Sequence, residues 1–252
     1  ASHNVHRWEG PPISGTRGSG TVFFSFCTAR CQFCQNYPIS QFGVGRDVTP
    51  HQLAGMMLDL QRQGCHNINL VTPSHYVAQI IEAAFIGARQ GLRIPLLYNT
   101  NGYDRVETLR LLDGIVDIYL PDSKYADDAV AARLSGFRGY VAVNRAALNE
   151  MRRQVGSGLL LDADGIAVRG MVVRHLVLPN GLSQTPDVLR WIATALGRDS
   201  WVSLMGQYFP THKVIGDAVL GRRLTSAEYD AARAALDELG LQEGWCQEFD
   251  DA

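Results

Sequence analysis

Short apolar runs alternate along this chain with longer stretches in which apolar residues recur every three or four positions. The short runs predict strands at residues 21–26, 67–72, 94–98, 115–120, 171–178 and 201–204. The longer stretches predict helices at residues 50–63, 77–90, 106–112, 140–154, 186–196 and 226–239, with a short helix within 123–139 and a turn or small hairpin within 155–170. Thr49 and Ser226 are the expected N-caps of two of these helices.

Six strand-then-helix units in series predict an α/β fold with a parallel sheet, and right-handed crossovers curl such a sheet into a barrel or an open sheet. Residues 1–20 are rich in Gly, Pro and polar residues, and we expect them to be a flexible lead-in packed across the barrel mouth. Residues 21–252 contain no linker or repeat and are expected to form a single domain.

Polar residues follow the predicted strands at their carboxyl ends. In parallel α/β folds these ends carry the ligand sites, so the polar residues found there are candidate site residues. They are Thr72, Ser74, His75, Asn99, Asn101, Asp122, Lys124 and Gln207.

Three cysteines follow the first predicted strand with the spacing C-x3-C-x2-C: Cys27, Cys31 and Cys34. Thiolates on so short a loop can converge on a metal centre, and a four-iron cluster with one open iron needs three of them. An open metal position is what a catalytic centre requires. The alternatives are three unrelated buried thiols or a partial zinc site.

This loop, with Phe33 just before its third cysteine, resembles the radical S-adenosylmethionine (SAM) superfamily. The resemblance implies a partial (β/α)6 barrel, the radical SAM core. It also implies a [4Fe-4S] cluster whose open iron chelates S-adenosyl-L-methionine, so that reductive cleavage gives a 5′-deoxyadenosyl radical that abstracts hydrogen. Cys27, Cys31 and Cys34 would hold the cluster, and Phe33 would pack near the adenine.

Further motifs resemble the pyruvate formate-lyase activating enzyme branch. They are TNGY at 100–103, the pair Asp122 and Lys124, the strand VVRHLVLP with Arg174, and MGQYFPTHK at 205–213. The resemblance assigns Lys124 to the methionine carboxylate. Because Arg174 lies within a strand, it needs a carboxylate partner, which is either Asp122 or a substrate group. The adjacent His175 is expected to pack on the opposite face of the strand.

Three positions depart from the activating-enzyme pattern. Residues 72–75 stand where that family often has Gly-Gly-Glu, so Ser74, His75 or backbone carbonyls must contact the SAM amino group. Asn99 replaces an acidic residue, and Gln207 replaces a histidine. His75 could instead be an acid or base toward the substrate. We therefore expect the cofactor to be bound by an altered set of side chains.

Composition excludes several classes of protein. The net charge of −2 does not suggest a nucleic-acid partner or an anionic membrane, and the sequence has neither a membrane span nor a signal pattern. Five cysteines, three of them clustered, do not suggest a disulfide framework, which favours a cytoplasmic location. Cys65 and Cys246 alone cannot complete a second cluster.

Three functions remain as hypotheses. The first is a radical SAM oxidoreductase that abstracts hydrogen from a glycine of a partner protein, with an external electron donor such as flavodoxin or ferredoxin. The second is a radical SAM enzyme acting on a small-molecule metabolite. The third is a non-catalytic iron–sulfur electron carrier or sensor, although such a protein would not need a barrel with polar strand ends.

Overall fold

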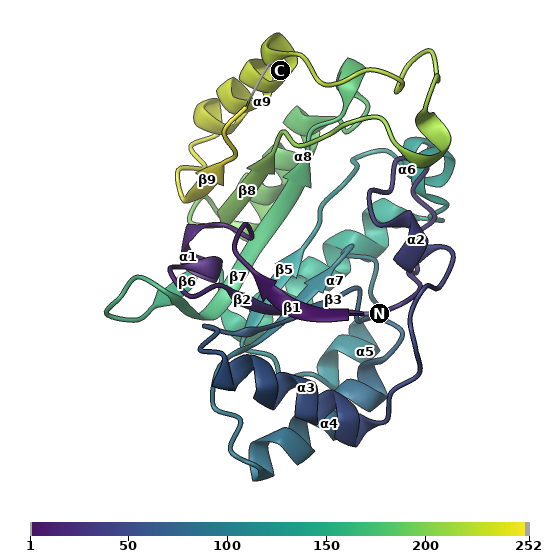
Figure 1. Cartoon of the computed structure of the whole chain (residues 1–252). Coiled ribbons are helices and arrows are strands. Elements are labelled where there is room, and N and C mark those ends of the chain that lie inside the picture. The colour runs from purple at the N-terminus through teal and green to yellow at the C-terminus, as the bar shows by residue number, and fades with distance from the viewer. Residues whose placement is uncertain (1, 250–252) are drawn as a thin grey trace.

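A curved β-sheet runs through the computed structural model, which describes residues 2–249 (Figure 1). Its strand order is β1-β2-β3-β4-β5-β7-β8-β9, and β6 pairs only with β7. The strands are β1 Ser2–His6, β2 Ser19–Phe23, β3 Ile68–Val71, β4 Leu96–Thr100, β5 Ile118–Pro121, β6 Leu159–Leu161, β7 Ala167–Leu176, β8 Trp201–Met205 and β9 Gly244–Cys246. From β2 to β8 six strands pair in parallel, which confirms the partial (β/α)6 barrel.

All the helices except α1, which follows β1, occupy the crossovers between the parallel strands. The helices are α1 Pro11–Ser14, α2 Tyr37–Ser40, α3 Pro50–Arg62, α4 Val77–Arg89, α5 Val106–Arg110, α6 Asp128–Ser135, α7 Tyr140–Val155, α8 Thr185–Trp191 and α9 Ser226–Glu238. Thr49 caps α3 as expected, through a capping box with Gln52. The expected N-cap of α9 is wrong by one residue: the side chain of Thr225 accepts the Glu228 N–H, and Ser226 is the first helical residue.

The two faces of the sheet bury different apolar sets. Ile68 and Leu70 of β3 pack with α3 and α4 on the outer face. Strand residues alternate between faces, so Leu97 and Leu120 point inward. There they form a small core with Ile13 of α1, which is fully buried. A residue of the lead-in therefore fills the inside of the barrel.

The expectation of a flexible lead-in is wrong. Residues Ser2–His6 form β1, which pairs antiparallel with β2, and α1 follows it. The Asn67 side chain donates to the Ile13 carbonyl at 2.8 Å, and Gly10 lies directly against the Trp245 ring of β9. The segment thus spans the gap between the two edges of the sheet (Figure 1). How residues 1–20 and 21–252 divide into domains stays a prediction.

His175 of β7 is fully buried with both ring nitrogens in contact, Nδ1 with the Ser123 carbonyl and Nε2 with the Thr185 hydroxyl. Burial lowers its pKa to about 4, so the folded protein holds it neutral. Its contribution to stability is therefore complete above its ordinary pKa near 6.5 and is lost as the pH falls toward 4.

We expect about 3 kcal/mol of unfolding free energy to be lost over this interval through His175 alone. Urea unfolding at several pH values checks this against His175→Gln, whose side chain does not titrate. An equal slope in both proteins between pH 6.5 and 4 would contradict the assignment.

Candidate functional site

The loop that carries the three cysteines follows the carboxyl end of β2 and lies against the end of α6. The Arg30 and Gln32 N–H groups donate to the carbonyls of Ser135 and Leu134, at 2.8 and 2.9 Å. A left-handed glycine, Gly136, ends α6 at this point. The loop is thus fixed by backbone contacts to an element more than one hundred residues away in sequence.

Each thiol has a polar neighbour. The Ser135 hydroxyl donates to Cys31 Sγ at 3.0 Å, and the Asn101 amide donates to Cys27 Sγ at 3.4 Å. Cys34 Sγ lies 3.1 Å from the Ser40 hydroxyl. Hydrogen bonds to sulfur tune the reduction potential of an iron–sulfur cluster.

The donor set fits a [4Fe-4S] cluster. Burial raises the pKa of the Cys27 thiol, and it raises that of Cys31 to about 11; the charge of Lys124 nearby opposes both shifts. Iron coordination supplies the positive charge that such buried thiolates need. Cys65 and Cys246 lie elsewhere, Cys65 in the core under α3 and Cys246 on β9.

A row of four charged side chains crosses the strand ends beside this loop. Glu9 accepts from Arg174 Nη1 at 2.9 Å, and Arg174 Nη2 lies 2.8 Å from an Asp122 oxygen. The other Asp122 oxygen lies 2.6 Å from Lys124 Nζ. All four side chains are less than 20% exposed. The carboxylate partner expected for Arg174 is therefore Asp122, with Glu9 as a second one.

Two opposing effects set the pKa values of Asp122, Lys124 and Arg174. Burial disfavours the charged forms, and ion pairing favours them. Burial would raise the pKa of Asp122, but Arg174 and Lys124 hold it below its ordinary value. Burial would lower the pKa of Lys124 and of Arg174, yet the neighbouring carboxylates raise both. All three groups are therefore charged at neutral pH.

The two asparagines at the end of β4 contact different parts of the site. Asn99 is buried, and its amide donates to Glu9 at 3.0 Å. Asn101 donates to Thr28 at 2.8 Å as well as to Cys27, so it ties β4 to the cysteine loop. The resemblance expects an acidic residue at the position of Asn99. Glu9, which accepts from the Asn99 amide, supplies a carboxylate beside that position.

Gly102 in the TNGY motif has a left-handed backbone, φ +72°. A Cβ at this position would overlap the Asp122 carbonyl and the Asn144 side chain. The motif therefore allows β4 and β5 to approach each other where Asp122 enters the charged row.

The other candidate residues have contacts within the protein, and their roles toward a cofactor stay predictions. Thr72 donates to the Val71 and Phe24 carbonyls, and Ser74 lies 3.2 Å from the Thr100 hydroxyl. His75 Nε2 lies 3.0 Å from the Ser25 carbonyl, just before the cysteine loop. Phe33 is buried edge-on against Tyr208, while Gln207 is exposed and contacts Gln247.

Two residues near the site were not found from the sequence. Glu9 belongs to the lead-in, where no spacing or motif marks it. Asn69 lies on the inward face of β3, because its neighbours Ile68 and Leu70 point outward. It is fully buried, and neither atom of its amide has a partner among the described residues. Only its position inside a predicted strand could have marked it as unusual.

In residues 2–249 there is no helix with the length and apolar character needed to cross a bilayer. The same residues contain no group of three His, Cys, Asp or Glu side chains placed to bind one metal ion. The three protein ligands of a four-iron cluster each bind a different iron, so they need not converge on a single point.

Comparisons with known proteins agree with this arrangement. Residues 21–159 match the model of the Radical SAM superfamily. An uncharacterized protein of Methanocaldococcus jannaschii is 28% identical over 232 residues, which are 88% of this chain and 63% of that protein. The chain thus spans less than two thirds of this relative's length.

Solved structures with similar folds have low sequence identity. The FeFe-hydrogenase maturase HydG of Carboxydothermus hydrogenoformans aligns with a TM-score of 0.62 at 11% identity, covering 92% of this chain and 54% of HydG. Methylornithine synthase aligns with a TM-score of 0.59 at 15% identity, covering 90% of this chain and 63% of the synthase. These two likenesses concern the fold. From the family match, the chain belongs to the radical SAM superfamily, whose members are enzymes that use a [4Fe-4S] cluster and S-adenosylmethionine.

Proposed function

We propose that this chain reductively cleaves S-adenosylmethionine and abstracts hydrogen from a glycine of a partner protein. The observation that carries the choice of a protein substrate is a set of exposed apolar side chains around the cysteine loop. The sequence motifs shared with the activating-enzyme branch support the same choice. An external one-electron donor of the flavodoxin or ferredoxin kind would complete the reaction.

In this proposal Cys27, Cys31 and Cys34 hold the cluster. When bound, the cluster and S-adenosylmethionine supply a 5′-deoxyadenosyl radical that abstracts a hydrogen atom. Lys124 binds the methionine carboxylate as a point charge, and Glu9 binds the amino group. Asp122 and Arg174 position these two residues, since they link Lys124 to Glu9 through short ion pairs.

The exposed apolar set, which we term the rim, comes from two connections at the carboxyl ends of strands. Tyr37 after β2 stacks on His212 after β8, with ring centroids 4.6 Å apart, so the two connections touch. The rim residues are Phe26, Phe42, Val44, Phe209, Ile215 and Val219, all between 40% and 73% exposed. Apolar residues gathered beside a site are typical of protein–protein interfaces.

We expect the positive charge of Lys124 to strengthen the binding of S-adenosylmethionine. Lys124→Gln should weaken S-adenosylmethionine binding by about tenfold to 150-fold, because a charge-assisted contact to a carboxylate contributes about 1.5–3 kcal/mol. Anaerobic calorimetry on the reconstituted protein measures this, with the visible spectrum of the cluster as the folding control. Unchanged affinity would remove Lys124 from the cofactor site.

We expect the rim to bind the partner protein and to have no effect on the binding or cleavage of S-adenosylmethionine. Ile215→Asp should lower hydrogen abstraction from a partner protein by about tenfold or more, because a buried charge at an interface is costly. Its basal 5′-deoxyadenosine production without partner should equal that of the parent chain. Leu160 is an exposed apolar residue of the β6–β7 hairpin, outside the rim, so Leu160→Asp is the matched control. Equal losses in the two variants would contradict a role of the rim.

Deuterium transfer tests the proposed function itself. Candidate partner proteins with deuterated glycine should pass deuterium into 5′-deoxyadenosine, and deuterated metabolites should not. Transfer from a metabolite alone would favour the second hypothesis, an enzyme acting on small molecules. The Asn69 amide inside the barrel, which has no hydrogen-bond partner among the described residues, is the observation in favour of that alternative. Failure to form 5′-deoxyadenosine would leave only an electron carrier or sensor.

A further inference from the structure

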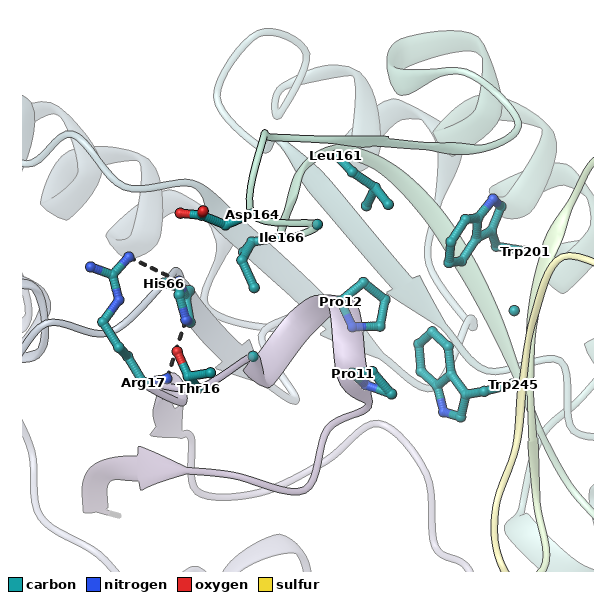
Figure 2. Close-up of a pocket in the computed structure, with 13 residues that line it drawn as sticks. Pro11, Pro12, Thr16, Arg17, His66, Leu161, Asp164, Ile166, Trp201 and Trp245 are labelled. Carbon is teal, nitrogen blue, oxygen red and sulfur yellow. Dashed lines mark hydrogen bonds between the residues drawn. The ribbon is translucent and has the colours of Figure 1, made fainter.

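A hollow lies at the opposite end of the barrel from the cysteine loop. It has a volume of about 820 Å³, and its lining comes from residues at or before the amino ends of β2, β3, β7, β8 and β9, together with α1 and the β6–β7 hairpin. Figure 2 shows an apolar side, with Trp201 and Trp245, and a polar side, with Arg17 and His66. The proposed function uses none of these residues.

A glycine packs against each of the two tryptophans. Trp245 lies against Gly10, where a Cβ would overlap its ring, and Trp201 lies 3.7 Å from the place a Cβ would take at Gly158. Pro11 and Pro12 of α1 lie next to Trp245 (Figure 2). Rigid aromatic and proline faces of this kind bind planar apolar groups at low entropic cost.

On the polar side, the Arg17 guanidinium and the His66 Nδ1–H have no shared acceptor among the described residues. The Arg17 backbone N–H donates to His66 Nε2 at 3.2 Å, so Nε2 carries no proton. The proton of a neutral imidazole is then on Nδ1, which lies 3.1 Å from Arg17 Nη2. Two donors therefore face each other, and His66 gives the guanidinium no acceptor.

An anion placed between these donors would accept from both. Burial and the nearby Arg17 charge lower the pKa of His66, so the ring is neutral at pH 7 and presents its Nδ1–H. Asp164 of the hairpin also lines the hollow and carries the opposite charge. It would weaken the binding of an anion without contributing to it.

We propose that this hollow is a second ligand site, which binds a small organic anion with a planar apolar body. The anionic group accepts from Arg17 and His66, and the planar body lies against Trp201 and Trp245. The volume lies in the range of small-molecule sites in proteins. The carboxyl end of the barrel, where the cysteine loop lies, remains free for the proposed reaction.

Three indoles with the same ring and different charges test the site: indole-3-acetate, 3-methylindole and tryptamine. The chain has four tryptophans, so its indole N–H signals can be assigned by Trp→Phe variants. Indole-3-acetate should shift the signals of Trp201 and Trp245 and leave those of Trp8 and Trp191. It should bind about tenfold or more tighter than 3-methylindole, and tryptamine should bind most weakly. Adenosine monophosphate tests whether a phosphate serves as the anion.

Two variants tie the preference to the proposed donors. Arg17→Gln should reduce the affinity for indole-3-acetate to that for 3-methylindole, while Arg233→Gln on α9, with the same change of charge, should leave it unchanged. Asp164→Asn should tighten binding of the acetate. The proposal is overturned if the three indoles bind equally, or if none of them shifts the two signals at about 10 mM. None of these outcomes depends on the cluster or on S-adenosylmethionine.

Discussion

Replacing Cys31 with alanine is expected to lower the iron content of the anaerobically reconstituted chain from about four per chain to less than about one. S-adenosylmethionine cleavage should fall by about 10³-fold or more, because no remaining group can hold the cluster in a reducible form. The same result is expected for Cys27→Ala and Cys34→Ala. Iron analysis and chromatographic detection of 5′-deoxyadenosine provide the two measurements.

The chain offers matched controls in its two other thiols. Cys65 lies in the core under α3, and Cys246 lies on β9, so Cys65→Ala and Cys246→Ala should keep the iron content and the cleavage rate. Loss of the cluster in either control would show that the assignment of three ligands is wrong. Circular dichroism of the apo proteins separates loss of iron from loss of fold.

Arg174→Met is expected to lower the unfolding free energy by about 3–5 kcal/mol, because it removes the cation that Asp122 and Glu9 share. Asp122 keeps Lys124, whereas Glu9 keeps the Asn99 amide and a longer contact of 4.0 Å to His6. Methionine retains most of the apolar volume, so the loss arises from charge. Urea unfolding of the apo protein at pH 7 measures it.

The pH dependence of this loss identifies its cause. In the parent chain the low pKa of Asp122 stabilises the fold above its ordinary value near 4, and this contribution is lost as the pH falls further. In Arg174→Met the Asp122 carboxylate, which keeps only Lys124, should take up a proton more easily, so the deficit should shrink between pH 7 and 5. Arg190→Met, which removes an exposed pair with Asp187, should cost less than about 1 kcal/mol. A deficit that does not change with pH would indicate lost packing instead.

Local sequence was enough to predict the cysteine loop and the parallel order of strands. The spacing of Cys27, Cys31 and Cys34 predicts a metal centre, since soft thiolate ligands on one short loop can converge on it. The alternation of short apolar runs and amphipathic stretches identifies β2 to β8 because period 2 and period 3.6 are properties of neighbouring residues. The sequence also predicted a carboxylate partner for Arg174, either Asp122 or a substrate group, since a charge inside a strand requires one. The structure identified Asp122 as that partner.

Only the tertiary structure revealed the place of Glu9 and of the segment around it. The lead-in has the Gly and Pro content of a loop, yet its strand and α1 close the gap between β2 and β9 and put a carboxylate beside Asn99 and Arg174. The same is true of the hollow lined by Arg17, His66 and the two tryptophans, which come from four separate parts of the chain. Such contacts join residues far apart in sequence. The free energy that favours them comes from burial and charge pairing, and neither produces a periodic pattern among neighbouring residues.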